Sequence, residues 1–487
     1  MPKPPAEMSR HSSLPRASRW RSAVPVLVLV IATGCAVGPN YRRPPGTQPE
    51  SFSAVAGSTR NPVEAAWWQG FRDGMLERLV GQAATNNLEL RVATARLREA
   101  RELWTLARFD FAPTVEANGT YRNAQSSSGS IAFNRNLARN LRHNELYHAG
   151  FDATWELDLW GRVRRNVEAA RATVEAVSAN RDDVLVAVRA EVALNYFELR
   201  GLQAQLEVAR RNATNQSDTV KLAEALRDGG QGTQFDVARA RSLLNTTLAA
   251  IPPLETRTTQ AQHRIAVLCG LNPTALREEL SVPASLPNRP ETVAIGNPGE
   301  LLRRRPDVRA AERSLAAATA RIGVETADLF PSVTFNGSLG LEANRLSGFD
   351  GAGTDAWGFG PHLSWAALDL GRVRQRIRAA GARAEAALAI YEQTALLALE
   401  EAENSLVALA QEQRRLAHLQ AAEQAAVEAV NLARQRYRDG VSDFISVLDA
   451  ERTLLSLQEQ RVASETQAAT RLVAVYKALG GAGTATP

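Results

Sequence analysis

The sequence lacks the motifs by which common enzyme classes are recognised. No Gly-rich phosphate loop precedes a Lys-Ser or Lys-Thr pair, and no Gly-x-Ser-x-Gly elbow is present. The six histidines are dispersed along the chain without the close pair typical of zinc sites. We therefore expect no enzyme activity, no cofactor and no metal site.

Charge of one sign is also missing as a long run. The net charge is +5, but acidic and basic residues alternate along the whole chain. Nucleic-acid-binding proteins instead concentrate basic charge on one face, so we expect no nucleic-acid partner. Aromatic residues are scarce at 6%, while long stretches consist mainly of Ala, Leu, Arg, Glu and Gln. This composition favours long helices over compact mixed domains.

The N-terminus has the three zones of an export signal. A basic leader precedes the apolar run Val24–Ala32, which is shorter than the roughly 20 residues of a membrane-spanning helix. Small residues then precede Cys35, which indicates a lipobox in which Cys35 becomes the lipidated first residue of the mature chain. Ala32 stands where Leu is more usual, and the alternative is a chance cysteine beside an ordinary cleavage site. Ala36 is not the Asp of inner-membrane retention, which predicts the outer membrane as destination.

Cysteine is nearly absent from the rest of the chain. Cys269 is the second of two cysteines and lies in an apolar segment. Because Cys35 would carry lipid, the mature chain can form no internal disulfide. We expect Cys269 to behave as a small buried hydrophobe.

The chain contains two copies of one unit. Trp155–Arg164 recurs as Trp365–Arg374, and Gly161 and Gly371 are 210 residues apart (371 minus 161). The same offset relates Gly230 to Gly440. Two repeats of about this length account for nearly the whole mature chain.

Each repeat contains two segments with a hydrophobic period of two, near 113–124 and 147–158 and again near 331–341 and 357–368. In the second segment Phe151 and Ala153 lie on the apolar edge, and Thr154 lies across the pleat. Segments of about ten residues suit tilted strands that cross a bilayer. A soluble antiparallel sheet would show the same alternation. The export signal and the aromatic apolar edges favour membrane strands.

Helical periodicity follows each pair of strands. The stretch from Gly161 to Gly229 contains no proline, and its counterpart runs from Gly371 to Asp439. Apolar residues at alternating spacings of three and four predict coiled-coil packing of these helices. Their first seam comprises Leu185, Val188, Val192, Asn195, Leu199, Leu202 and Leu206, and a poorer seam comprises Leu399, Ala402, Leu406, Leu409, Gln413 and Leu416. Shorter helical segments are expected near 66–108, 235–268, 300–328 and 445–479.

Four strands cannot stand alone in lipid. An open sheet leaves unpaired backbone groups at both edges, and about eight strands form the smallest membrane barrels. The chain must therefore pool its strands with other copies. Helices about 100 Å long would continue the resulting cylinder away from the membrane.

The sequence resembles the TolC/OprM-type outer-membrane efflux factors, in their lipoprotein (NodT-like) branch. The resemblance covers the mature chain in order and is carried by Cys35–Tyr41, Trp67-Trp68 with Phe71, Trp155–Arg162, Leu301–Glu312 and Gly440–Arg452. It implies mixed α and membrane β structure, in which a homotrimer forms a twelve-stranded barrel and a helical periplasmic tunnel. It also implies three kinds of partner: a periplasmic adaptor, an inner-membrane pump of the RND class, and outer-membrane lipid.

These patterns divide the chain into six parts. They are a signal peptide (1–34), a lipid-anchored extension (35–65), the first repeat (66–282), a proline-rich linker (283–299), the second repeat (300–480) and a flexible tail (481–487).

The turns that end the two long helices are candidate sites of contact with the adaptor. Their residues are Arg227, Gly229, Gly230, Arg438 and Gly440. Glycine at these positions is also expected to end the helix, because it readily adopts left-handed backbone. A role in adaptor contact would be additional to this structural role. The triplet Arg303-Arg304-Arg305 is interpreted as a solvated turn.

A carboxylate gate is expected near the same turns. In the resembled family the last tip motif often carries two acidic residues, but here Ser446 occupies the earlier place and Asp449 the later. Asp236 of the first repeat corresponds to Ser446. A ring would then consist of Asp449 with Asp236, and the alternative is that both are ordinary helix-face carboxylates.

The sequence predicts a passive conduit for drugs or other small molecules in a tripartite efflux pump. A type I protein-secretion duct uses the same architecture and is the first alternative. A coiled-coil lipoprotein without a pore is the second, and the alternating strands argue against it.

Overall fold

The computed structural model describes residues 36–45, 51–52, 58–59, 61, 64–125, 143–290 and 292–481. The expected signal peptide and Cys35 lie outside these residues, as do much of the 35–65 extension and all but the first residue of the tail. The chain forms two compact units. The first contains Leu103–Arg171 and Ala317–Ala384 with the segment ending at Tyr41, and the second contains Arg42–Glu102, Ala172–Ala316 and Glu385–Pro487.

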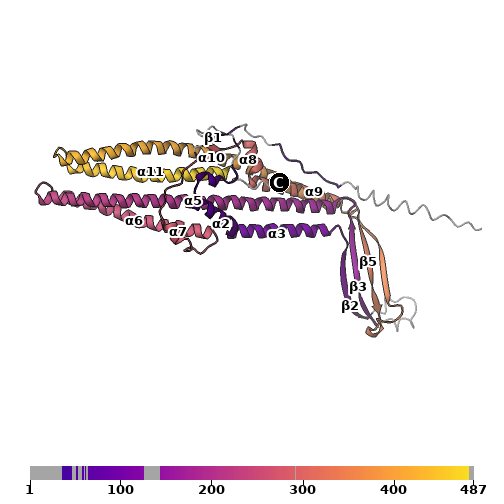
Figure 1. Cartoon of the computed structure of the whole chain (residues 1–487). Helices are drawn as coiled ribbons and strands as arrows, with labels where there is room; N and C mark the ends of the chain where they lie inside the picture. The colour runs from indigo at the N-terminus through magenta and orange to yellow at the C-terminus, as the bar shows by residue number, and fades with distance from the viewer. Residues whose placement is uncertain are drawn as a thin grey trace, which may run out of the picture. The chain divides into compact units, whose positions relative to one another are not determined.

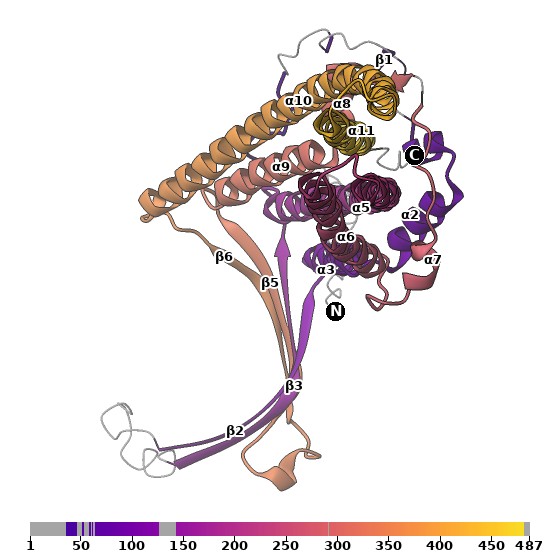
Figure 2. The ribbon, with the colours of Figure 1, turned by 90° about the vertical axis from the view of Figure 1, so that its left-hand side faces the viewer.

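The first unit is built on a four-stranded antiparallel sheet (Figures 1 and 2). Its order is β2 (Thr114–Gln125), β3 (His143–Leu157), β5 (Ser332–Ala343) and β6 (Asp355–Ser364). The expectation of four strands, two from each repeat, is confirmed. Strand β3 begins four residues before the predicted segment. Strand β6 ends earlier than predicted, because the chain turns at Ala366, whose carbonyl accepts from the Asp369 N–H at 2.9 Å.

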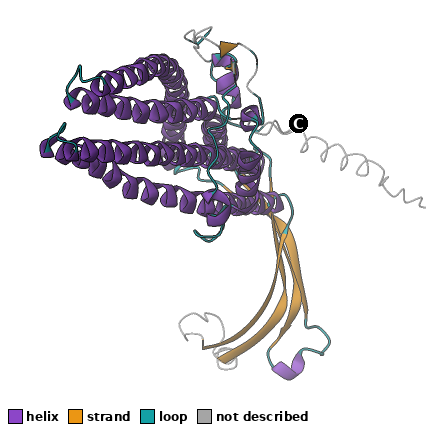
Figure 3. Ribbon diagram, turned by 60° about the vertical axis from the view of Figure 1, so that its left-hand side comes forward, coloured by secondary structure: helices purple, strands orange, loops and turns teal. Residues whose placement is uncertain are grey.

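Long helices follow the strands of each repeat (Figure 3). Helix α5 (Arg162–Asp228) has 67 residues and α10 (Leu370–Arg438) has 69. Each turns back into a second helix, α6 (Gln234–Leu268) and α11 (Phe444–Ala478) respectively. Val188, Val192, Leu199 and Leu202 of the predicted first seam are at most 2% exposed. The coiled-coil expectation is confirmed.

The predicted helix over 66–108 is wrong as a single element. It is divided into η1 (Trp67–Phe71), α2 (Gly74–Asn86) and α3 (Leu88–Phe109). Asp73 caps α2 by accepting from the Leu76 N–H at 2.9 Å. Asn87 interrupts the helical stretch, because its backbone is extended with ψ of 132°. Its side-chain oxygen accepts from the Leu90 N–H, and its side-chain nitrogen donates to the Leu268 carbonyl at 2.9 Å. Side-chain hydrogen bonds thus compete with helix continuation.

The remaining elements lie in the N-terminal extension, between the repeats and within them. They are β1 (Ser58–Thr59), which pairs in parallel with β4 (Val293–Ala294), then α7 (Arg277–Ser281), α8 (Pro298–Arg304), α9 (Pro306–Ala327) and η2 (Leu346–Gly348).

Arg305 is not part of a solvated turn, so that interpretation is wrong. Its side chain is 11% exposed and pairs with Asp307 and Glu401. It also donates to the Ala478 carbonyl at 2.7 Å, at the end of α11. The start of α9 is thereby fixed to the C-terminal helix.

An aromatic core holds the second unit together. Trp67 stacks on Tyr476 with ring centroids 5.1 Å apart, and Phe71 packs against Phe197. Burial raises the pKa of Tyr476 to about 12. Cys269 is fully buried, as expected, and burial raises the pKa of its thiol to about 11, which leaves it inert.

Candidate functional site

The sheet has one apolar and one polar face, as the alternation predicted. The strand pairing places Phe151 opposite Ala117 on one side and Leu339 on the other, and Leu339 opposite Trp357. All odd-numbered residues of the four strands therefore share one face. Phe151, Leu339 and Trp357 are each at least 58% exposed in the protomer. An apolar face this bare marks an interaction surface, and strands of this length suit lipid.

The even-numbered residues form the polar face. Asn118 donates a hydrogen bond to Asp152 across β2 and β3. His148 Nδ1 lies 3.4 Å from a carboxylate oxygen of Glu342 across β3 and β5. Polar groups of this kind need water or one another, so this face suits the lining of an aqueous passage.

Tryptophans mark the end of the sheet where strands meet helices. Trp155 donates from its indole nitrogen to the Phe111 carbonyl at 3.0 Å, and Trp365 donates to that of Leu329 at 3.1 Å. Trp160 donates to the Pro331 carbonyl and stacks on Phe330 at 4.5 Å. Side chains with an apolar body and a polar tip settle at the boundary between hydrocarbon and water.

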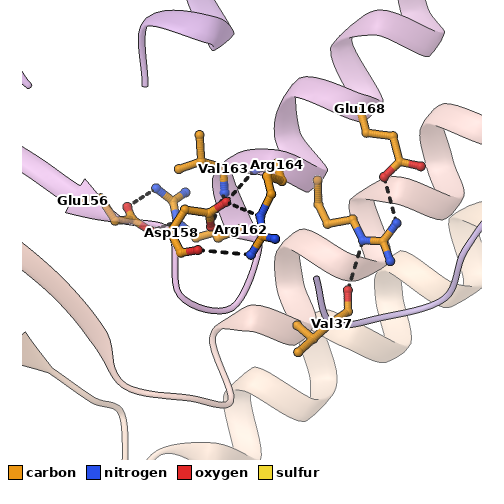
Figure 4. A network of polar contacts seen from close by, with 8 residues as sticks. Val37, Glu156, Asp158, Arg162, Val163, Arg164 and Glu168 are labelled. Atoms are coloured by element: carbon orange, nitrogen blue, oxygen red, sulfur yellow. Dashed lines mark hydrogen bonds and ion pairs between the residues drawn. The ribbon is translucent and has the colours of Figure 1, made fainter. Parts of the chain in front are cut away.

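The turn from β3 into α5 is held by ion pairs (Figure 4). Asp158 accepts from the N–H groups of Val163 and Arg164, both at 3.0 Å, and so caps α5. Arg164 pairs with the same carboxylate at 3.0 Å. Arg162 donates from Nε to Glu156 at 2.7 Å. The repeated motif therefore works here as a strand-to-helix joint.

The second copy of this strand-to-helix joint is exposed. Asp369 pairs with Arg372 at 3.4 Å, but their side chains are 57% and 86% exposed. Ala366 replaces the glutamate of the first copy at the corresponding position. Leu368 likewise stands in place of Asp158, so the second copy lacks both carboxylates that hold the first joint.

Residues 36–40, which we call the strap, are fixed against the first joint. The Val37 N–H donates to the Trp160 carbonyl at 3.0 Å. Arg165, with a side chain only 4% exposed, donates to the carbonyl of Val37 (Figure 4) and to Asn40 Oδ1 at 3.1 and 2.7 Å. Sequence reasoning missed Arg165, because no local pattern shows which side chain a distant segment will meet.

Glycines let the strap approach this closely. Gly161 has φ of +84°, and a Cβ there would lie 2.6 Å from the Ala36 Cα. Gly38 has φ of +88°, and a Cβ there would lie 2.5 Å from the Gly323 Cα. Neither position has room for a side chain. Ala36, the residue after the expected lipid-bearing Cys35, therefore packs on the first joint.

The predicted tip residues lie at the turns between the long helices. Gly230 and Gly440 have φ of +73° and +72°, as helix-ending glycines should. Arg227 pairs with Asp228 at 2.6 Å and donates to Gln234 Oε1 at 3.1 Å. Gly229 donates its N–H to the Ala225 carbonyl at 3.0 Å. Arg438 Nε lies 3.4 Å from the Arg434 carbonyl.

The two predicted gate carboxylates have different local partners. Asp236 forms a capping box with Thr233 at the start of α6, accepting from its hydroxyl at 2.7 Å. Burial, and secondarily the charge of Asp236, raises the pKa of Tyr437. Asp449 pairs with Arg452 at 2.9 Å, and both side chains are more than 60% exposed.

Within the described ranges, no helix is both long enough and apolar enough to cross a bilayer. The same residues include no group of three or more His, Cys, Asp or Glu side chains placed to hold a metal ion.

A sheet with a bare apolar face, joined to coiled-coil helices, defines a subunit of a membrane channel. The profile of the outer membrane efflux protein family matches residues 79–271 and 297–481. The chain belongs to this family. It is an outer-membrane efflux component and not an enzyme.

Relatives and solved structures agree with this assignment. Nodulation protein T of Rhizobium leguminosarum bv. trifolii is 31% identical over 459 residues, which cover 93% of this chain and 96% of that protein. Outer membrane protein OprJ of Pseudomonas aeruginosa is 30% identical, with 94% and 95% covered. The solved structure of the outer-membrane channel OprN is 41% identical, covers 92% of this chain and 100% of its own, and has a TM-score of 0.85. The resemblance found in the sequence is confirmed.

Proposed function

We propose that three copies of this chain form a passive outer-membrane duct, with a twelve-stranded barrel and a helical tunnel. The observation that carries this proposal is the two-faced sheet, whose edges at β2 and β6 are unpaired within the described residues. In hydrocarbon each unpaired backbone group costs several kcal/mol, so the edges must be closed by other copies. The apolar face then meets lipid, and the polar face surrounds water.

Periplasmic adaptor and RND-type pump are the proposed partners. Relatives in Pseudomonas putida are named as the outer membrane protein of a toluene efflux pump and as a pyoverdine export outer membrane protein. These names describe different substrates for two relatives of this chain. This supports a passive conduit whose substrate selectivity resides in another component of the pump. The tip residues Arg227, Gly229, Gly230, Arg438 and Gly440 are the proposed adaptor contacts, because they lie at the ends of α5 and α10 and all but the half-buried Arg227 are exposed.

The domain boundaries set out above belong to the same proposal. Residues 1–34 are the signal peptide, Cys35 carries lipid, and 283–299 links the repeats at 66–282 and 300–480. The strap supports the lipid anchor. Ala36 packs on the joint between β3 and α5.

Native mass spectrometry tests the assembly and the anchor together. We expect three mature chains per particle, each beginning at Cys35 with acyl chains attached. Cys35→Ser should give particles of the same stoichiometry without acyl mass, because the sheet holds the protein in the membrane independently. Particles of one chain would contradict the duct and favour the coiled-coil scaffold. An unmodified N-terminus at another residue in the wild-type protein would contradict the lipobox alone.

A type I secretion duct would pass the same test. Deleting the gene and complementing it separates the two functions: small-molecule sensitivity should rise in the deletion strain, while the secreted protein profile should stay unchanged. A lost secreted protein with unchanged sensitivity would support the secretion duct instead.

Asp449 and Asp236 are the proposed gate. Three copies of Asp449 around a narrow axis would repel one another and attract cations. We expect Asp449→Asn, alone or with Asp236→Asn, to raise conductance in planar bilayers and to weaken block by divalent cations. Asparagine at 236 can still accept the capping hydrogen bond, so the helix start is preserved.

The matched control for the gate is Glu255→Gln, at an exposed carboxylate that pairs with Arg210 at 2.7 Å on α6 and α5. This change should leave conductance and divalent block as in the wild type. If the aspartate variants also behave as the wild type, the two carboxylates are ordinary helix-face residues.

A further inference from the structure

Both edges of the sheet are free to pair. Strand β2 has 12 residues and β6 has 10, and in the part of the chain that the structure describes each is paired along one side only. Alternation of direction across the four strands makes β6 antiparallel to β2 of another copy. The closing pair is therefore antiparallel, and what remains open is its register.

The stagger of the strand ends gives that register. A line drawn straight across the ladder from Thr114, the first residue of β2, meets Thr154, Asn336 and Gly360. These residues lie three, four and four positions from the strand ends at Leu157, Ser332 and Ser364. The ends thus recede by a little more than one residue for each strand crossed. At four residues over three strands crossed, the trend reaches about five residues at the next strand, and six is the nearest even offset.

An offset of six also agrees with the tilt of membrane strands. Six residues at about 3.3 Å each, across four strand spacings of about 4.8 Å, give a tilt of about 45°. Membrane strands are tilted by roughly 35–45°. An offset of four would give a tilt of about 35°, at the lower limit of that range, and an offset of eight would demand about 54°, which lies outside it. An odd offset is excluded because it would turn the apolar face of one copy into the polar face of the next.

We propose that β6 pairs with β2 of a second copy so that Gly360 lies opposite Thr120 of the partner subunit. Phe359 then faces Tyr121 of the partner subunit, which places two exposed aromatic rings side by side on the lipid face. Asp355 faces Gln125 of the partner subunit, so every residue of β6 has a partner within β2. The inference rests on the proposed oligomer, but the offset does not depend on the number of copies.

Cysteine cross-linking tests the register in the full-length protein, in a Cys269→Ala background. Three double variants share Tyr121→Cys and differ in the second change: Trp357→Cys, Phe359→Cys or Pro361→Cys. Directly opposite Cβ atoms are about 5 Å apart, whereas diagonal neighbours are farther than a disulfide spans. We expect Phe359→Cys to give covalent dimers and trimers on denaturing gels several-fold faster than the other two.

Ala117→Cys with Phe151→Cys is the positive control, because these residues face each other within one chain. It should form an internal disulfide and no covalent oligomer. Faster cross-linking through residue 357 or 361 would overturn the register and leave the oligomer intact. If none of the three pairs links chains while the control forms its disulfide, the register is overturned and the proposed closure by β2 and β6 fails with it.

Discussion

Replacing Phe151 with arginine is expected to destabilise the folded protein by roughly 2–4 kcal/mol per chain in a bilayer. Phe151 lies on β3, an inner strand, between Ala117 and Leu339. Its side chain is 58% exposed on the apolar face. A guanidinium at that place would have to enter hydrocarbon or distort the sheet to reach water. Unfolding by urea in lipid vesicles, followed by tryptophan fluorescence, measures the change.

Thr154→Arg is the matched control for this prediction. Thr154 lies three residues away on the same strand but on the polar face, opposite Thr114 and Asn336. Arginine there can stay in water, so the cost should be within about 0.5 kcal/mol, as for an ordinary surface change. Phe151→Leu should also be mild, since it keeps the apolar contact with lipid. Equal destabilisation by both arginines would show that the odd-numbered face does not meet lipid.

The face of each strand residue was predictable because it follows from position alone. Successive side chains of a strand alternate, so the parity of Phe151 and Thr154 separates them whichever strands lie beside β3. The long helices were predictable for a similar reason, since the seam through Val188 and Leu199 repeats over many turns. Periodic signals of this length outweigh local propensity.

Single side chains that override a pattern could not be read from the sequence. Asn87 breaks a helical stretch because its amide reaches Leu268, 181 residues away. Arg305 is buried because Asp307, Glu401 and Ala478 surround it. Each depends on a segment that is distant in the sequence, and the periodicity of the local stretch holds no information about it.

The strap illustrates the same limit at the site. Gly38 and Asn40 stood out as part of a motif, but their partner Arg165 did not. The contact of the strap with Arg165 requires the positive φ of Gly161 and the absence of a side chain at Gly323. Both requirements are visible only in the folded unit. The carboxylates of the tips were predicted as candidates, and the capping role of Asp236 was overlooked, although Thr233-x-x-Asp236 has the spacing of a capping box.

The buried ion pair near the tips should control how easily α11 opens. Glu451 is 7% exposed and accepts from Arg434 Nε and Nη2 at 3.0 and 2.7 Å. It also accepts from the Thr219 hydroxyl at 3.1 Å, so the carboxylate joins α5, α10 and α11. Removing Arg434 would leave a buried charge with one neutral donor. Breaking fully buried pairs costs about 3–5 kcal/mol. Because Arg434 is 41% exposed, we expect roughly 2–3 kcal/mol, below that range.

Amide hydrogen exchange over Phe444–Arg452 measures this opening directly. Arg434→Ala should speed exchange there by roughly 30- to 150-fold, at 1.36 kcal/mol for each factor of ten. Arg452→Ala removes an arginine of the same tip from an exposed pair with Asp449, worth at most about 0.5 kcal/mol, and should change exchange about twofold or less. Glu451→Gln should fall between them, because it removes the buried charge and leaves the half-exposed Arg434 free to hydrate. If Arg434→Ala and Arg452→Ala exchange alike, the Glu451 carboxylate has another source of compensation and does not hold the three helices together.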